Sequence, residues 1–249
     1  MKITQEFLQQ RVALYAERIN HAPQLKAALI DMDGVLYDSM KNHTKSWHRM
    51  ATELGIECTR EEFYLYEGMT GTKQIQLVYK RQFGEDLPED KAAEYYEIKA
   101  QYFIDYGAAG PMPGAAEMLN HLRDAGIMRV LVTGSAQLSL IESLNRDFPG
   151  IFCNDARVTA LDVKRGKPDP EPYLMGQQKA NAQPWECMVI ENAPLGVTAG
   201  HRAGSFVVGV TTGPVPAETM WEAGADLVVD SMPEFAQCIV PLIDLLKAK

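Results

Sequence analysis

Several features typical of secreted, membrane-bound or metal-stapled proteins are scarce or missing in this 249-residue sequence. It has only four cysteines, Cys58, Cys153, Cys187 and Cys238, and no C-x-x-C pair. Their wide spacing favours reduced, packed thiols over a disulfide framework or a zinc site. No run approaches the roughly 18 apolar residues of a membrane span, and the N-terminal segment lacks the apolar stretch of a signal peptide. We therefore expect a cytoplasmic protein without a membrane partner.

Positive charge is also in short supply. The chain has 24 Lys and Arg against 33 Asp and Glu, which gives a formal net charge of -9. A field of this sign repels a nucleic-acid backbone, so nucleic acid is excluded as a partner. A small phosphorylated metabolite is still compatible with it, because local cationic groups and a bound metal outweigh the global charge at short range.

The pattern of apolar runs predicts an α/β fold. Short apolar runs at 27–30, 128–132, 188–190, 205–210 and 225–229 alternate with helix-like segments, and 4–20 has the spacing of an amphipathic helix. Runs without polar alternation fit strands buried on both faces, which indicates a parallel, doubly wound, Rossmann-like sheet. Three of these runs end in polar residues, which should converge at the carboxyl edge of the sheet.

The pattern of apolar residues changes between the first predicted strand and residue 113. Aromatic and apolar residues recur there at mostly helical spacing and no comparable strand is present. We interpret residues 40–112 as an inserted helical cap, with 1–39 and 113–249 forming the core. The segment 111–114, Pro-Met-Pro-Gly, is a candidate for the returning hinge.

Two carboxylates stand where the first strand gives way to a turn. Asp31 could attack phosphorus as a nucleophile and form an aspartyl phosphate. Asp33 is then placed to protonate the leaving oxygen and later to activate water. Adjacent carboxylates need a cation, and an oxygen-rich Mg²⁺ site answers that need, with Glu191 and Asn192 as further ligands.

Other strand ends supply groups that suit a phosphoryl ligand. Thr133 and Ser135, with the amides around Gly134, offer hydrogen-bond donors, and Lys167 offers a positive charge. Each motif alone also occurs in ordinary turns. The prediction of a phosphoryl-transfer site therefore depends on their order and their placement at strand ends.

Together these motifs resemble the haloacid dehalogenase superfamily, and within it the group that contains β-phosphoglucomutase. The likeness runs from Lys26 onward and includes 189–197, Val-Ile-Glu-Asn-Ala-Pro-Leu-Gly-Val. It implies a Rossmann-like core with a helical cap, Mg²⁺ dependence, and Asp31 as phosphoryl acceptor. It also implies a metal held by the Asp31 carboxylate, the main-chain carbonyl of Asp33, and an acid of the last motif.

The sequence departs from that group at the metal and in the cap. Asn192 stands where relatives usually have Asp, and Glu67 stands where the mutase has a lysine; the mutase's arginine near Gly71 is also missing. We hypothesise that Glu67 closes onto Mg²⁺ and offsets the charge missing at Asn192. The substrate would then be compact, with inorganic pyrophosphate or a small phosphate ester favoured.

Two more side chains are candidates for the substrate site. Lys99 is predicted to reach a leaving phosphate from the cap, and His43 to lie near Asp33. Phosphoryl transfer on hexose phosphates, as in β-phosphoglucomutase, is the alternative activity. A third hypothesis, suggested by Asn192 in place of the usual Asp, is a binding or regulatory relative without turnover. We expect a monomer.

Overall fold

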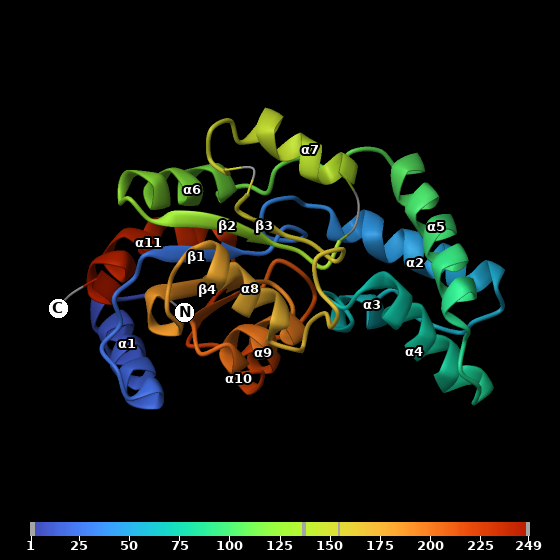
Figure 1. Cartoon of the computed structure of the whole chain (residues 1–249), viewed down its shortest axis with the longest axis horizontal. Helices are drawn as coiled ribbons and strands as arrows, with labels where there is room; N and C mark the ends of the chain where they lie inside the picture. Colours follow the sequence, from blue (N-terminus) through green and yellow to red (C-terminus); the bar gives the residue numbers. More distant parts are fainter. Residues whose placement is uncertain (1–2, 136–137, 154, 248–249) are drawn as a thin grey trace.

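The computed structural model describes residues 3–135, 138–153 and 155–247 and has a sheet-containing core beside a helical lobe (Figure 1). The six strands are all parallel, in the order β3-β2-β1-β4-β5-β6. Their bounds are β1 (Ala27–Ile30), β2 (Met128–Val132), β3 (Arg157–Val158), β4 (Cys187–Glu191), β5 (Phe206–Val210) and β6 (Leu227–Val229). This confirms the predicted parallel sheet. Strand β3 was not predicted, because two residues leave no recognisable pattern.

Helices cover both faces of the sheet. One face packs against α1 (Gln5–Ile19), α6 (Ala115–Asp124), α7 (Leu138–Asp147) and α11 (Met232–Lys247). The other packs against α8 (Glu171–Lys179), α9 (Pro194–Arg202) and α10 (Ala217–Glu222), and a short 3₁₀ turn, η1 (Pro184–Glu186), precedes β4. Burial on both faces explains why the strands are apolar at every position.

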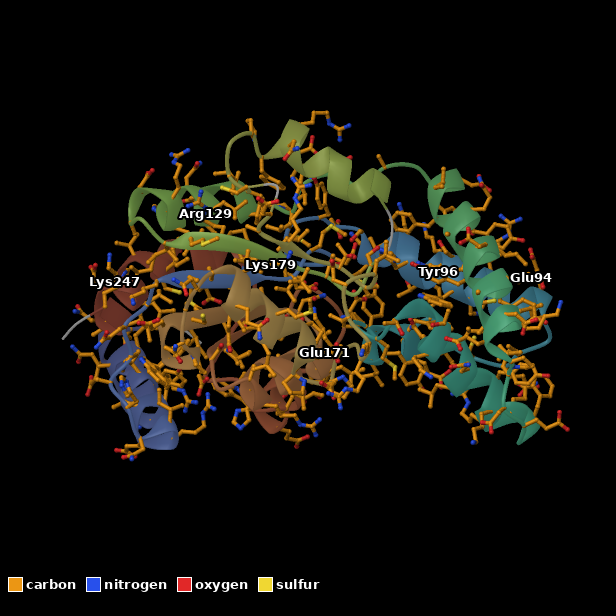
Figure 2. The ribbon with its side chains drawn as sticks, in the orientation of Figure 1. Glu94, Tyr96, Arg129, Glu171, Lys179 and Lys247 are labelled. Carbon is orange, nitrogen blue, oxygen red and sulfur yellow. The ribbon has the colours of Figure 1, made fainter. Side chains whose placement is uncertain are left out.

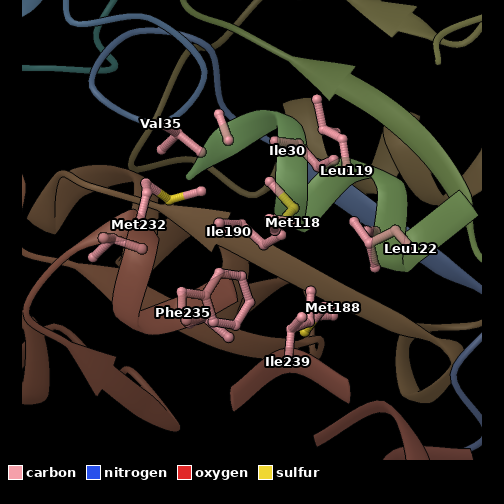
Figure 3. Close-up of a cluster of buried hydrophobic side chains, with 14 of the residues drawn as sticks. Ile30, Val35, Met118, Leu119, Leu122, Met188, Ile190, Met232, Phe235 and Ile239 are labelled. Atoms are coloured by element: carbon pink, nitrogen blue, oxygen red, sulfur yellow. The ribbon is translucent and has the colours of Figure 1, made fainter. Parts of the chain in front are cut away.

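The alternating side chains of each strand divide the interior into two clusters. Ile30 and Ile190 point into the cluster with Met118, Phe235 and Ile239 (Figure 3). Leu29 and Val189 point to the opposite face, among the residues of α8 to α10. The strand positions are therefore locked by two independent hydrophobic layers.

The sheet order creates a crevice between β1 and β4. The chain leaves β1 toward β2 on one side, and β4 leads toward β5 on the other, so the connections diverge at this point. Ile30 pairs with both Leu131 and Ile190, which aligns the carboxyl ends of the three central strands. Open α/β sheets bind ligands at such a switch point.

The helical lobe occupies the predicted insertion. It consists of α2 (Met40–Glu53), α3 (Glu62–Leu65), α4 (Gly71–Phe83) and α5 (Glu89–Asp105), around a core of its own that includes Met50, Phe63 and Ile75. The two segments that connect the lobe to the sheet run side by side and form a β-bridge between Tyr37 and Pro111. That pairing supports the domain boundaries at 39/40 and 112/113, which stay predictions.

The cysteines follow the expectation only in part. All four are free thiols, and Cys187 and Cys238 are buried. Cys58 is partly exposed and Cys153 is exposed, so the expectation of packed thiols is wrong for Cys153, which lies in the loop after α7 at the surface. Within the described ranges, no helix has the length and apolarity needed to cross a bilayer.

Helix α1 is part of the core and is anchored by polar contacts as well. Leu8 and Tyr15 are each 1% exposed, and the Tyr15 hydroxyl donates to the Gly204 carbonyl at 3.0 Å. Arg18 forms an ion pair with Asp226 at 2.8 Å beside the start of β5. The helix therefore stabilises the sheet edge that lies away from the helical lobe.

Truncating the buried face of α1 should weaken the whole fold. Leu8→Ala is expected to lower the free energy of unfolding by about 2–5 kcal/mol, because it leaves a cavity in the core. Leu14→Ala on the same helix, at a position 43% exposed, should change it by less than about 0.5 kcal/mol. Urea denaturation measures both; equal effects would contradict this packing.

Candidate active site

A buried ion cluster lies at the carboxyl edge between β1 and β4. Asp31 directly follows β1, and Glu191 ends β4. The Lys167 ammonium lies 2.5 Å from Asp31 Oδ1 and 2.5 Å from Glu191 Oε1, and it also donates to the Val132 carbonyl at 3.3 Å. Three segments that are distant in sequence thus meet at one cation.

Glu191 is held in place on every side. Its Oε1 accepts from the Tyr173 hydroxyl at 2.6 Å, while Oε2 accepts from the main-chain amides of Asn192 and Ala193 at 3.0 and 3.2 Å. The carboxylate is fully buried. These contacts favour a role in positioning Lys167; the metal-ligand role predicted for Glu191 stays a prediction.

Two opposing effects act on Asp31. Burial raises the pKa of this carboxyl to about 8, although the Lys167 charge pulls it down. The neighbouring charges of Glu191 and Asp33 add to the rise. A further cation at this edge would therefore favour the ionised form, which is the form that can act as a nucleophile.

Asp33 belongs to a second hydrogen-bonded chain that reaches the helical lobe. Its Oδ1 lies 3.0 Å from His43 Nε2 and accepts from the Ser39 hydroxyl at 2.5 Å. Burial acts to raise the pKa of Asp33, but His43 and Ser39 outweigh it and the pKa is lowered. Lys99 Nζ lies 2.7 Å from His43 Nδ1, so Lys99 donates to a neutral imidazole that in turn donates to Asp33.

The contacts of Lys99 favour a role that the sequence did not indicate. The side chain is 2% exposed, and burial lowers the pKa of its ammonium to about 8. Its described hydrogen bond goes to His43 and not to an open subsite. His43 itself lies near Asp33, as predicted. Lys99 still lines the central cavity, so the predicted contact with a leaving phosphate stays a prediction.

The turn after β2 brings hydrogen-bond donors to the same edge. Thr133 is buried, and its hydroxyl accepts from the Ser135 amide at 3.0 Å. Gly134 and Ser135 line the central cavity. The structure thus gathers Thr133, Gly134 and Ser135 beside the ion cluster, as the sequence analysis expected.

The cap loop at 67–71 closes directly on the core. A Cβ added to Gly134 would lie 2.8 Å from the Gly68 carbonyl oxygen, and one added to Gly68 would lie 2.8 Å from Lys167 Cδ. The closure brings Glu67 near the acidic groups: desolvation, Asp33 and Asp31 raise its pKa well above the usual value. Glu67 is thereby placed at the acidic centre.

The closed cap leaves a small chamber. The central cavity has a volume of about 40 Å³, far below the roughly 300–1,000 Å³ of pockets for drug-sized ligands. Its lining combines catalytic-edge and cap residues: Asp33, His43, Trp47, Glu67, Gly68, Met69, Gly71, Gln74, Tyr96, Lys99, Gly134 and Ser135. Only a compact ligand fits while the cap is closed.

The donor set fits a magnesium ion. Asn192 Oδ1 is buried and has no hydrogen-bond partner among the described residues, so this oxygen is available to a cation. The charges fit too: with all groups ionised, the carboxylates of Asp31, Asp33, Glu67 and Glu191 outnumber the ammonium groups of Lys99 and Lys167 by two. Burying this surplus is costly without a cation.

Among the described residues, no group of three or more His, Cys, Asp and Glu side chains is spaced to hold a metal. A magnesium site built here would instead combine carboxylates with an amide oxygen and a main-chain carbonyl. Such neutral oxygens are ordinary ligands for this hard cation.

Sequence reasoning missed some residues that shape the site. Ser39 bonds Asp33, and Tyr173 bonds Glu191. Ser39 directly precedes α2 and lies close to Asp33 in sequence. Serine at such a position often forms local hydrogen bonds, so the sequence held a usable signal for it. Tyr173 and Tyr96 left none, because single tyrosines on helices are ordinary packing residues.

Comparisons with known proteins agree with this arrangement. Residues 25–204 match the family model for haloacid dehalogenase-like hydrolases. The chain is 31% identical to hexitol phosphatase A of Escherichia coli over 89% of this chain and 98% of that protein. It is 28% identical to β-phosphoglucomutase of Bacillus subtilis over 82% of this chain and 89% of that protein.

A solved structure is similar over nearly the whole length. It is a Bacteroides vulgatus protein with a provisional assignment as a β-phosphoglucomutase, 42% identical, with a TM-score of 0.95. The similarity covers 98% of this chain and 100% of that one. It supports both the sheet order and the position of the helical lobe.

Removing the cation of the cluster should affect both folding and turnover. Lys167→Met leaves the carboxylates of Asp31 and Glu191 buried without their partner, so the free energy of unfolding should fall by about 3–5 kcal/mol at neutral pH. Turnover should fall by about 10²-fold or more. Lys164→Met, an exposed position of the same loop, is the matched control.

Calorimetry and phosphate release measure the two effects. A Lys167→Met variant as stable and active as the control would contradict the central position of this lysine.

Proposed function

Because the chain belongs to the haloacid dehalogenase-like hydrolases, we propose that it is a Mg²⁺-dependent phosphohydrolase that works through an aspartyl phosphate on Asp31. We propose inorganic pyrophosphate or a compact phosphate ester as its substrate. The observation that carries this proposal is the chamber of about 40 Å³ in which a cap acid, Glu67, faces the catalytic carboxylates.

In this proposal Asp31 attacks the phosphorus and the bond to the leaving oxygen breaks. Lys167, 2.5 Å from Asp31 Oδ1, compensates the charge of the carboxylate and the phosphoryl group. Thr133, Ser135 and the amides around Gly134 supply hydrogen bonds to phosphoryl oxygens.

Asp33 moves the protons. It donates to the leaving oxygen in the first half-reaction, then accepts a proton from the water that hydrolyses the aspartyl phosphate. The lowered pKa of Asp33 suits the base role, and an anionic substrate beside it would raise that pKa for the acid role. His43, held between Asp33 and Lys99, orients the carboxylate.

The magnesium ion would be held by the Asp31 carboxylate, the Asp33 main-chain carbonyl and Asn192 Oδ1, with Glu67 completing the site from the cap. When bound, the ion supplies positive charge against the carboxylates and the transferring group. The orphaned Asn192 oxygen supports this set.

A second candidate is phosphoryl transfer or phosphate release on sugar phosphates. The names of the relatives favour it, since one is a hexitol phosphatase and another a β-phosphoglucomutase. The small chamber favours the compact substrate, because a phosphorylated sugar needs more room than the closed cap leaves.

The assay of phosphate release separates these candidates. With Mg²⁺, we expect release from pyrophosphate to exceed that from hexose phosphates, and a chelator should abolish it. Conversion of glucose 1-phosphate without release would establish the mutase alternative instead. Asp31→Asn should remove the activity entirely; activity that survives this change does not use the proposed nucleophile.

Replacing Glu67 tests its contact with the metal. Glu67→Ala should raise the Mg²⁺ concentration for half-maximal activity by about tenfold or more, the size of effect seen when metal-site partners are lost. Adding Asn192→Asp in the same variant should restore part of the affinity, because the missing charge returns.

Glu61→Ala, an exposed acid of the cap, is the control. Magnesium titrations of activity measure all the variants. If Glu67→Ala titrates like the control, Glu67 does not belong to the metal site.

A further inference from the structure

Gly71 and Tyr96 form a steric pair on the cap side of the chamber. A Cβ added to Gly71 would lie 2.1 Å from both Cδ2 and Cε2 of Tyr96, and 3.0 Å from its Cγ. Real Cβ atoms do not approach other atoms so closely, and these three atoms belong to a rigid ring. The tyrosine ring therefore occupies the space that any side chain at position 71 would need.

The backbone of Gly71 does not itself require glycine. Its φ lies outside the left-handed region, in contrast to Gly68 with a φ of 87°. Gly71 is the first residue of α4, a position that most residue types can adopt. The glycine is thus demanded by Tyr96 and not by the local conformation.

Tyr96 is fixed where it stands. It lies on α5 (Figure 2), and Lys99, three residues later, shares its side of the helix. The Trp47 ring packs at 6.1 Å from it between centroids, and the Lys99 ammonium lies 5.9 Å from its ring centroid. Trp47 in turn stacks on Phe63 at 5.6 Å. A swing of the Tyr96 ring would disturb this whole layer.

Both members of the pair line the central chamber together with Glu67 and Lys99. We propose that Tyr96, accommodated by Gly71, is the wall that limits substrate size in this enzyme. The inference rests on the proposed function, because it explains how a compact phosphate compound would be selected over a phosphorylated sugar. Tyr96 acts here as a specificity-determining residue and takes no part in bond making.

Opening the wall should change selectivity more than activity. Tyr96→Ala is expected to raise the ratio of kcat/KM for glucose 6-phosphate to that for pyrophosphate by at least about tenfold, the scale of discrimination that shape alone provides. Tyr96→Phe, which keeps the ring, should keep the wild-type ratio. Tyr95→Ala, next in sequence and absent from the chamber lining, is the matched control and should also keep it.

A double-variant cycle tests the steric pairing by a readout independent of substrate. Gly71→Ala should lower the melting temperature and the kcat/KM of the wild-type enzyme, because the new Cβ overlaps the ring. The same change made in Tyr96→Ala should have a much smaller effect on both. Equal effects of Gly71→Ala in the two backgrounds would refute the pairing.

The outcomes also separate this inference from the proposed function. If the unaltered enzyme prefers hexose phosphates, the proposed substrate is wrong, whatever the variants do. If it prefers pyrophosphate and Tyr96→Ala lowers kcat/KM for both substrates in proportion, the function stands and Tyr96 is only structural. A ratio that shifts in Tyr96→Ala but not in Tyr96→Phe or Tyr95→Ala supports the wall.

Discussion

The ammonium of Lys167, buried between Asp31 and Glu191, is the interaction on which the rest of the site depends. A charge removed from water is tolerated only when opposite charges and hydrogen bonds surround it. Here the two carboxylates come from neighbouring strands, and Glu191 is oriented by Tyr173 and by two main-chain amides. The cluster therefore requires the strand order β2-β1-β4, and it positions the proposed nucleophile in return.

The cap builds on this cluster through close backbone contacts. Gly68 packs on the Lys167 side chain and its carbonyl meets Gly134, so the loop descends to the core without an intervening side chain. This close packing of the cap loop on the core brings Glu67 near the other carboxylates and limits the volume of the chamber. In the proposed enzyme, one constraint thus joins metal binding to substrate size: the loop that brings Glu67 to the cation site also confines the chamber that Tyr96 bounds.

The polar chain from Lys99 through His43 to Asp33 connects the cap to the core in a second way. Lys99 comes from α5 and His43 from α2, whereas Asp33 belongs to the turn after β1. Because cap residues hold the proposed proton-transfer group, Asp33, that group is correctly oriented only when the cap is closed. Water exclusion and catalytic alignment would then occur together.

Local pattern made much of this molecule predictable. Strands buried on both faces leave uninterrupted apolar runs, and the polar residues that end three of those runs, at Asp31, Thr133 and Glu191, lie at one edge because parallel strands point the same way. Helical spacing likewise predicted an inserted lobe, and the helices α2 to α5 run from Met40 to Asp105. Strand β3, with two residues, and the exposed position of Cys153 escaped prediction because neither leaves a periodic signal.

The sequence by itself determined the fold class, the family and the set of groups that carry charge, because these depend on residue type, order and spacing along the chain. Only the tertiary structure decided that Glu191 faces Lys167, that Lys99 bonds His43, and that Tyr96 fills the space above Gly71. These contacts join residues that are 24, 56 and 25 positions apart. They depend on how elements that are distant in sequence pack together, within the core for the first contact and within the cap for the other two. The directions of side chains across such packed elements are not written in any local pattern.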